Sequence, residues 1–330
     1  MAKKDFFTKL FGGLSKMFRK HGLRIAGVFL LAFTLSLFPS PNVYFQTVKK
    51  TGGIFIPKEI PLPSPPPYPV NQTGKLPPSL SAAAILIKDL GSGVVIYAKD
   101  EKTRFPSAST TKIIASLVAL DNYKLDDVIT VKKVINEGKT MGLVQGEKLT
   151  FESLLYGSLV HSANDATYVL ADNFPGGTDK FVEKMNEKVK SLGLTETNFT
   201  NPVGFDDSKH YTTASDLAKQ AEVALSNKTI AKIVGTKAIT VSDVNFTYFH
   251  ELKNVNELLG RVAGVSGVKT GFTGNAGEVL VSEVKKNGQT VLLVILKSAD
   301  RFGETTKLID WVFGNFVWVP FMEIIPASQK

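Results

Sequence analysis

Nine prolines lie within residues 57–78, and this stretch limits what the chain can fold into more than any other feature. Proline fixes φ and lacks a backbone N–H, so such a dense run favours extended polyproline II over a packed core. At about 3.1 Å per residue, the stretch reaches roughly 70 Å. The sequence therefore predicts a spacer over residues 46–80, with the folded part after it. A docking site for a proline-binding partner is the alternative.

The predicted spacer separates two parts of unlike charge. The chain carries 39 Lys and Arg against 30 Asp and Glu, but 11 of the bases and only two of the acids precede residue 80. The remainder holds 28 of each sign, so it offers no electrostatic footprint for nucleic acid. The chain has no cysteine, which excludes disulfides, thiolate catalysis and Cys-ligated zinc.

The N-terminal segment has the pattern of a membrane anchor. Residues 1–24 are basic with apolar positions at helical spacing, as in a cytoplasmic helix on an anionic membrane surface, although Gly12 and Gly13 favour an unstructured leader. Residues 25–45 are long enough to span a bilayer, and no small-x-small cleavage site follows them. We expect a single-pass protein of the cell membrane, with everything after this segment outside the cytoplasm. A cleaved, secreted form is the alternative.

The part from residue 81 to 318 is predicted to be one α+β domain, followed by a tail over 319–330. Strands are predicted at both ends of this part and helices in its middle, so one sheet is expected to join early and late segments. Gly91-Ser-Gly93 and Lys286-Asn-Gly288 are typical hairpin turns. The predicted strands cover 82–90, 94–98, 128–131, 279–284 and 290–296, and the predicted helices 109–120, 149–170 with a break near 161–164, 179–192, 214–225 and 304–316.

Ser109-Thr-Thr-Lys112 places a hydroxyl and an amine three residues apart at the start of an apolar run. On a helix these two positions share a face. A serine needs a base to become a nucleophile, and a lysine whose pKa is lowered by burial or nearby positive charge can be that base. In isolation the pattern is weak. It recurs at Ser266-Lys269 and Ser282-Lys285, and a solvated helix start capped by Ser107 or Ser109 is the alternative.

Two further motifs follow in order, Ser162-Ala-Asn164 and Lys269-Thr-Gly271. Similar triplets at 40–42 and 50–52 lie beside the membrane segment and precede the nucleophile, so we discount them. The ordered set indicates serine acyl transfer. The sequence has neither a Gly-x-Ser-x-Gly elbow nor a His-Glu-x-x-His motif. We therefore expect structural roles for His161, His210, His250, Asp165 and Asp216.

The chain resembles the serine-type D-alanyl-D-alanine carboxypeptidases, the low-molecular-mass penicillin-binding proteins of peptidase family S11. Beyond the three motifs, the resemblance rests on Met141-Gly-Leu, Asn201-Pro-Val-Gly-Phe, His210-Tyr-Thr-Thr-Ala and Gly267-Val-Lys-Thr-Gly-Phe-Thr273. It implies a β-lactamase-like fold, in which a mainly antiparallel sheet is flanked by helices. A helical subdomain forms the other wall of the cleft.

The resemblance implies four catalytic residues. Ser109 attacks the carbonyl between two terminal D-alanines, and Lys112 takes its proton. Asn164 hydrogen-bonds Lys112 and the substrate, and Ser162 relays a proton to the leaving amine.

Five further residues are expected to bind substrate. Lys269 keeps Lys112 neutral and attracts the substrate carboxylate, which Thr270 and Arg301 also contact. The backbone N–H of Phe272, with that of Ser109, forms the oxyanion hole, and Gly271 leaves room at the strand edge.

The expected function is that of an exported D,D-carboxypeptidase acting on peptidoglycan stem peptides through an acyl-enzyme, without metal or cofactor. It is expected to bind β-lactams, and to contact the membrane through its N-terminal segment. A D,D-endopeptidase that cuts peptidoglycan cross-links is the nearest alternative. A β-lactamase and a non-catalytic cell-wall scaffold are the others. The sequence has no convincing Glu-x-x-x-Asn element to position a deacylating water.

Overall fold

The computed structural model describes residues 65–320, together with Gly22, Leu30, Phe33 and Thr34. The chain divides into two units, residues 1–62 and 63–330, and the second is described below. Across the described residues, no helix is both long and apolar enough to cross a bilayer. The predicted basic segment, membrane anchor and C-terminal tail lie almost entirely outside these residues, and their assignment stays a prediction.

A five-stranded antiparallel sheet forms the centre of the domain, in the order β3-β2-β10-β9-β8. Val291 in β10 lies opposite Asp89 in β2, so the sheet joins the two ends of the domain as predicted. Asn287 and Gly288, with φ of 54° and 76°, form the tight turn of the β9–β10 hairpin. The strands are β2 (Ala84–Asp89), β3 (Val95–Lys99), β8 (Val265–Thr273), β9 (Gly277–Lys286) and β10 (Gln289–Ser298).

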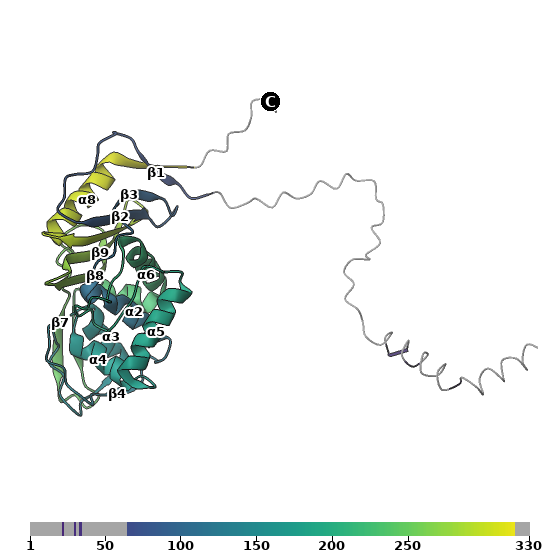
Figure 1. Cartoon of the computed structure of the whole chain (residues 1–330), viewed down its shortest axis with the longest axis vertical. Coiled ribbons are helices and arrows are strands. Elements are labelled where there is room, and N and C mark those ends of the chain that lie inside the picture. Colours follow the sequence, from purple (N-terminus) through teal and green to yellow (C-terminus); the bar gives the residue numbers. More distant parts are fainter. Residues whose placement is uncertain (1–21, 23–29, 31–32, 35–64, 321–330) are drawn as a thin grey trace, which may run out of the picture. The chain divides into compact units, whose positions relative to one another are not determined.

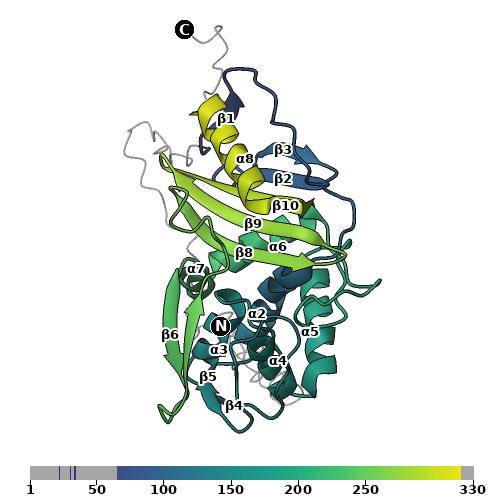
Figure 2. The same ribbon diagram turned by 90° about the vertical axis from the view of Figure 1, so that its left-hand side faces the viewer.

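Both faces of the sheet are covered (Figure 2). Alternate residues of β10 show this, because side chains in a strand point to opposite faces in turn. Leu292, Val294 and Leu296 belong to the large core shared with the helical part. Val291, Leu293 and Ile295 belong to a smaller core under helix α8 (Arg301–Asn315).

The helical part packs on the other side of the sheet, and helix α2 (Lys112–Leu120) runs through it (Figure 1). Every residue of α2 from Lys112 to Ala119 is buried, as expected for a helix apolar on nearly all sides. The helix predicted over 149–170 is broken near the expected place. The surrounding helices are α3 (Phe151–Leu159), α4 (Asn164–Asn173), α5 (Gly177–Ser191), α6 (Ala214–Ser226) and α7 (Lys228–Val234).

Several short elements are not predicted by the sequence pattern. Strand β1 (Tyr68–Asn71) pairs with β11 (Phe316–Val319), although it lies within the predicted spacer. The Nε1 of Trp311 also donates a hydrogen bond to the carbonyl of Lys75. The folded part therefore begins before residue 81. The other elements missing from the predicted set are α7, β8 and the strands β5 (Lys148–Thr150), β6 (Ala238–Ser242) and β7 (Phe249–Lys253); β5 pairs with the expected β4 (Val128–Thr130), and β6 with β7.

Candidate active site

Ser109 lies in a single 3₁₀ turn, η2 (Ala108–Thr111), directly before α2. Side chains at i and i+3 eclipse in a 3₁₀ turn, and the Oγ of Ser109 lies 2.9 Å from the Nζ of Lys112. Neither η2 nor α2 has a side-chain cap, so the helix-cap alternative is wrong. The competing Ser-x-x-Lys pairs lie in strands β8 and β9, where residues three apart point to opposite faces.

Hydrogen bonds of the Thr111 hydroxyl stabilise the 3₁₀ turn that carries Ser109. The Oγ1 of Thr111 donates to the carbonyl of Ala108 and lies 2.8 Å from the Nε2 of His210. The Nδ1 of His210 accepts from the N–H of Thr200. Burial lowers the pKa of His210 to about 4, so the ring is neutral and donates from Nε2. His210 therefore has the structural role expected of it.

Lys112 is fully buried, and its Nζ has three neighbours. It donates to the Oδ1 of Asn164 at 2.8 Å and to the carbonyl of Val203 at 3.1 Å, and Ser109 is the third. The oxygens of Asn164 and Val203 can only accept hydrogen bonds, so they take both N–H groups of neutral Lys112. The lone pair of Nζ then faces the Oγ of Ser109. Burial lowers the pKa of Lys112 to about 7, against the opposing effect of the Asp165 carboxylate.

Ser162 lies in the turn between α3 and α4, and Asn164 is the first residue of α4. Ser162 has a φ of 62°, in the left-handed region, and both side chains are nearly buried. The Nδ2 of Asn164 donates to the carbonyl of Glu137 at 2.8 Å, which leaves Oδ1 to face Lys112. The backbone N–H of Asn164 donates to the carbonyl of Lys139. The loop that contains Glu137 and Lys139 thus fixes the orientation of Asn164.

Lys269 approaches from the other wall, on strand β8. Its buried Nζ donates to the Oγ of Ser162 at 2.8 Å and to the carbonyl of Thr270 at 3.0 Å. Its pKa is well below the usual lysine value. Burial is the main cause, and the other contributions come from the positive charges of Lys112, Arg301 and Lys139. A charge on Lys112 therefore disfavours protonation of Lys269.

Strand β8 is an edge strand of the sheet and runs past Ser109. A Cβ at Gly271 would lie 2.9 Å from the Cβ of Ala108 and 3.1 Å from the backbone nitrogen of Ser109, so only glycine allows this approach. The Nη1 of Arg301, the first residue of α8, donates to the carbonyl of Gly271 at 3.0 Å.

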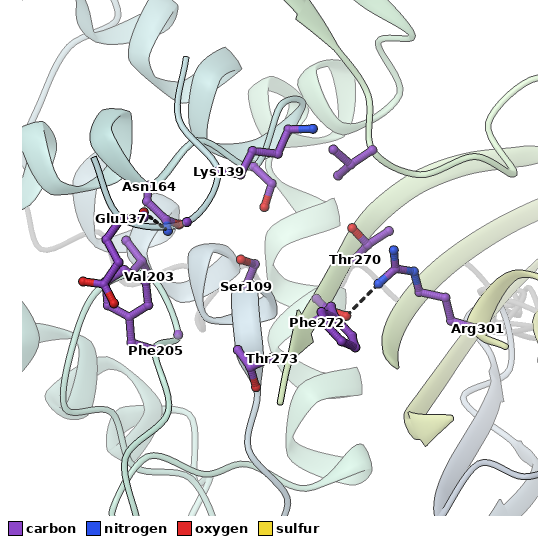
Figure 3. A pocket seen from close by; sticks show the side chains of 15 residues that line it. Ser109, Glu137, Lys139, Asn164, Val203, Phe205, Thr270, Phe272, Thr273 and Arg301 are labelled. Carbon is purple, nitrogen blue, oxygen red and sulfur yellow. Dashed lines mark hydrogen bonds between the residues drawn. The ribbon is translucent and has the colours of Figure 1, made fainter. Parts of the chain in front are cut away.

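These residues surround a cleft of about 450 Å³. Figure 3 shows Ser109 between Asn164 on the helical side and Thr270 and Phe272 on the β8 side. The predicted residues that line the cleft are Ser109, Ser162, Asn164, Thr270, Gly271, Phe272 and Arg301. Lys112 and Lys269 are buried behind it and reach it through their hydrogen bonds with Ser109 and Ser162.

Other residues that line the cleft had no predicted role. They are Glu137, Gly138, Lys139, Val203, Gly204, Phe205, Val255 and Thr273. The segment Asn201-Pro-Val-Gly-Phe was a sequence signal for three of them. Gly204 has a φ of +91°, and a Cβ there would lie 1.7 Å from the carbonyl oxygen of Ala108. This glycine therefore allows the carbonyl of Val203 to reach Lys112.

The arrangement is suited to acyl transfer, because a buried amine contacts a serine hydroxyl in a cleft with further cationic groups. Among residues 65–320, no three histidine or acidic side chains gather in a way that could hold a metal ion.

Comparison with known proteins gives a consistent result. Residues 71–300 match the D-alanyl-D-alanine carboxypeptidase family, peptidase S11. The chain is 33% identical to D-alanyl-D-alanine carboxypeptidase DacF of Bacillus subtilis, over 74% of this chain and 65% of that protein. It is 31% identical to a D-alanyl-D-alanine endopeptidase of Pseudomonas aeruginosa, over 81% of this chain and 86% of that one. The crystal structure of the Streptomyces K15 DD-transpeptidase superposes with a TM-score of 0.69 at 33% identity, covering 73% of this chain and 100% of that one.

Proposed function

This chain belongs to the D-alanyl-D-alanine carboxypeptidase family, peptidase S11, and we propose that it is itself a serine D,D-carboxypeptidase. It removes the terminal D-alanine from peptidoglycan stem peptides. The observation that carries this proposal is the 2.9 Å contact between the Nζ of buried Lys112 and the Oγ of Ser109, which lines the cleft.

Acylation begins with neutral Lys112. As the Oγ of Ser109 attacks the carbonyl carbon between the two D-alanines, its proton passes to the Nζ of Lys112. The carbonyl oxygen becomes an oxyanion, which the N–H groups of Ser109 and Phe272 stabilise. One such donor lowers the barrier by about 3–4 kcal/mol. The close approach of Gly271 to Ser109 supports this assignment, because it brings β8 and the 3₁₀ turn together.

The terminal D-alanine then leaves as an amine and needs one proton. Ser162, which is hydrogen-bonded to Lys269, supplies it. The proton that Lys112 took from Ser109 then restores the hydroxyl of Ser162, so Lys112 is neutral again. The remaining peptide is bound to Ser109 as an ester. A water molecule attacks this ester and gives a proton to Lys112, which passes it to the Oγ of Ser109 as the ester bond breaks. The shortened peptide is released with a new carboxylate, and Ser109 and neutral Lys112 are restored.

The substrate carboxylate is bound at the end of the cleft that carries Thr270 and Arg301. The buried Nε of Arg301 has no hydrogen-bond partner within the described part of the chain, and its Nη1 is held by Gly271. A guanidinium fixed in this way is suited to a carboxylate. Lys269 adds positive charge from beneath, and a bound anion favours its protonated form. β-Lactams, which carry a carboxylate beside a reactive carbonyl, are expected to acylate the same serine.

A D,D-endopeptidase activity is the second candidate, favoured by the 31% identity to a protein of that name. The catalytic residues do not distinguish the two activities, since both break a bond after D-alanine.

We also propose that the catalytic part lies outside the cytoplasm, where peptidoglycan is found, and that residues 25–45 anchor the protein in the membrane. Support comes from the apolar run and its basic flank. Protease treatment of intact cells tests this: cleavage of the catalytic part is expected, and protection that ends only on lysis would contradict it.

The proposed activity is tested by incubating the purified full chain with a stem pentapeptide that ends in D-Ala-D-Ala. We expect release of free D-alanine, and none from a Ser109→Ala variant. Equal release from both proteins would contradict the proposal. A cross-linked muropeptide dimer, offered in parallel, measures the endopeptidase activity.

A further inference from the structure

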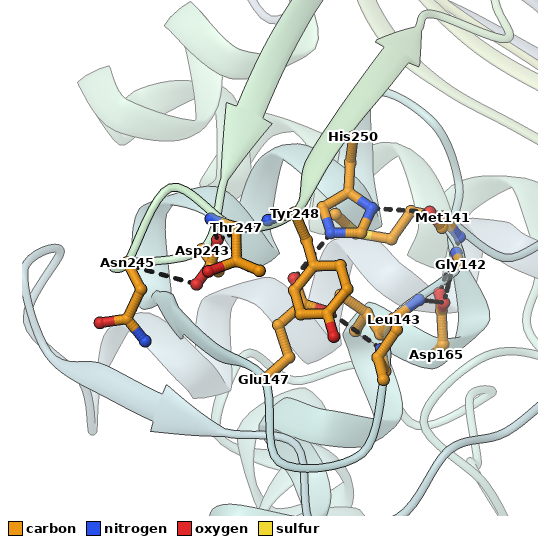
Figure 4. Close-up of polar contacts among 11 residues, drawn as sticks. Met141, Gly142, Leu143, Glu147, Asp165, Asp243, Asn245, Thr247, Tyr248 and His250 are labelled. Atoms are coloured by element: carbon orange, nitrogen blue, oxygen red, sulfur yellow. Dashed lines mark hydrogen bonds and ion pairs between the residues drawn. The ribbon is translucent and has the colours of Figure 1, made fainter.

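His250 and Glu147 form a buried pair that the proposed chemistry does not use. His250 lies on β7, and Glu147 ends the loop that follows β4. The Nε2 of His250 lies 2.7 Å from the Oε1 of Glu147, and the two side chains are 7% and 0% exposed. The Nδ1 of His250 lies 2.9 Å from the carbonyl oxygen of Met141, in the same loop (Figure 4).

This geometry requires a proton within the pair. The carbonyl of Met141 can only accept, so Nδ1 carries a hydrogen. A second hydrogen must then lie between Nε2 and the carboxylate, on one atom or the other, for the 2.7 Å contact to be attractive. Loss of that hydrogen would set a ring lone pair against a carboxylate oxygen. The other carboxylate oxygen of Glu147 already accepts from the N–H of Val144.

The loop held by this pair leads to the active site. The carboxylate of Asp165 accepts from the N–H groups of Met141, Gly142 and Leu143 at 3.0–3.1 Å. A few residues earlier, the carbonyls of Glu137 and Lys139 accept from the side chain and the backbone of Asn164.

Asn164 therefore fixes the start of the loop over residues 137–147, Asp165 fixes its middle, and His250 joins the middle, at Met141, to the end, at Glu147. Glu137, Gly138 and Lys139 of this loop also line the cleft.

We propose that His250 and Glu147 are positioning residues, whose protonated contact clamps this loop and so holds the Oδ1 of Asn164 against Lys112. The inference rests on the proposed function only in taking Ser109 as the nucleophile. Other ionisable groups nearby are already engaged. The carboxylate of Asp243, between β6 and β7, accepts from the backbone N–H groups of Asn245, Thr247 and Tyr248. The Nδ1 of His161 accepts from the backbone N–H of Lys253 at 3.4 Å.

The test uses the full chain and measures the rate constant for acylation of Ser109 by a fluorescent penicillin as a function of pH. Glu147→Gln is the decisive variant, because its amide can donate to Nε2 of a neutral histidine while its oxygen still accepts from Val144. The contact then needs no shared proton. We expect the wild type to lose acylation at alkaline pH and Glu147→Gln to retain it, with similar rates at neutral pH. Glu251→Gln, an exposed carboxylate on the same strand, is the matched control and should follow the wild type.

A His250→Ala variant should acylate about 10- to 100-fold more slowly at neutral pH, since a misplaced catalytic group carries a cost of this order. If His250 acts through Asn164, adding His250→Ala to an Asn164→Ala variant should lower the acylation rate little further. The inference would be overturned if the rate losses caused by His250→Ala and Asn164→Ala multiply in the double variant. It would also be overturned if Glu147→Gln loses acylation at alkaline pH as the wild type does.

Amide hydrogen exchange over residues 137–147 gives a readout that does not depend on activity. His250→Ala should accelerate amide exchange at Met141, Gly142 and Leu143, and Glu147→Gln should not. All rates are corrected for the dependence of intrinsic amide exchange on pH. Unchanged exchange in His250→Ala would also overturn the inference. A wild type that penicillin does not label would contradict the proposed function instead, and the exchange data would still decide whether the clamp exists.

Discussion

The Nζ of Lys269 donates a hydrogen bond to the Oγ of Ser162 across 2.8 Å, and this contact joins the sheet to the helical part at the cleft. A second lysine–serine pair, Lys112 and Ser109, lies within the helical part. Two buried ammonium groups so close together are costly, so the protein favours a neutral form for at least one of them. An arriving carboxylate favours the charge on Lys269, which leaves Lys112 as the neutral base. Substrate binding and base activation are thereby coupled.

The nucleophile can be identified by comparing two serines that share the same local motif. Ser109→Ala should abolish covalent labelling by fluorescent penicillin and lower D-alanine release by at least about 10⁴-fold, because no other group attacks the carbonyl. Ser266→Ala is the control, since Ser266 also precedes a lysine by three residues but lies on β8, hydrogen-bonded to Glu283. It should label as the wild type does. Label retained in Ser109→Ala would show that the nucleophile is another residue.

The acylation rate should depend on pH through Lys112. Its pKa of about 7 means that the amine is protonated and unable to accept a proton below that value, and becomes neutral above it. The rate constant for penicillin acylation is therefore expected to fall about tenfold for each pH unit below 7 and to level off just above 7, before the alkaline loss expected from the His250–Glu147 contact. Lys112→Arg, which stays charged, should lose at least about 10³-fold at every pH. A rate independent of pH between 5 and 8 would contradict a lysine base.

The fold was largely predictable because its main elements carry local signals. The Asn287-Gly288 turn predicts the β9–β10 hairpin, and the apolar run after Lys112 predicts a buried helix. The β1–β11 ribbon could not be predicted in this way. Tyr68-Pro-Val-Asn71 lies in a proline-rich segment, and its partner strand begins at Phe316, so no local pattern connects them.

The site was predictable for side chains with distinctive chemistry and not for backbone groups. The motif order singles out Ser109 and Lys112, which the structure brings into contact. The carbonyls of Val203 and Glu137, which orient Lys112 and Asn164, have no such signal, because every residue has a carbonyl group. The sequence analysis assigned the low pKa of Lys112 partly to Lys269. In the structure burial is the largest cause.

Arg301 should affect substrate binding more than the chemical step. Arg301→Leu is expected to raise KM for a D-Ala-D-Ala peptide about 10- to 100-fold, because it removes a charge-assisted contact to the carboxylate. The value of kcat should change less. Arg261→Leu is the matched control, since that side chain is exposed and paired with Glu257. A substrate whose terminal carboxylate is converted to an amide should show little difference between Arg301→Leu and the wild type. Equal losses with both substrates would contradict a carboxylate contact.

Gly271 should be sensitive to the addition of a single methyl group. In Gly271→Ala the new Cβ would contact the Cβ of Ala108 and approach the backbone nitrogen of Ser109 at 3.1 Å, so β8 must move away from the 3₁₀ turn. The separation of the Ser109 and Phe272 N–H groups would then increase, and acylation is expected to slow about 100-fold, as when one oxyanion donor is removed. Gly274→Ala is the control, because a Cβ there meets nothing within 4 Å. Thermal unfolding of both variants separates this effect from a loss of stability. If Gly271→Ala acylates as fast as Gly274→Ala, the edge of β8 does not contribute the oxyanion donor.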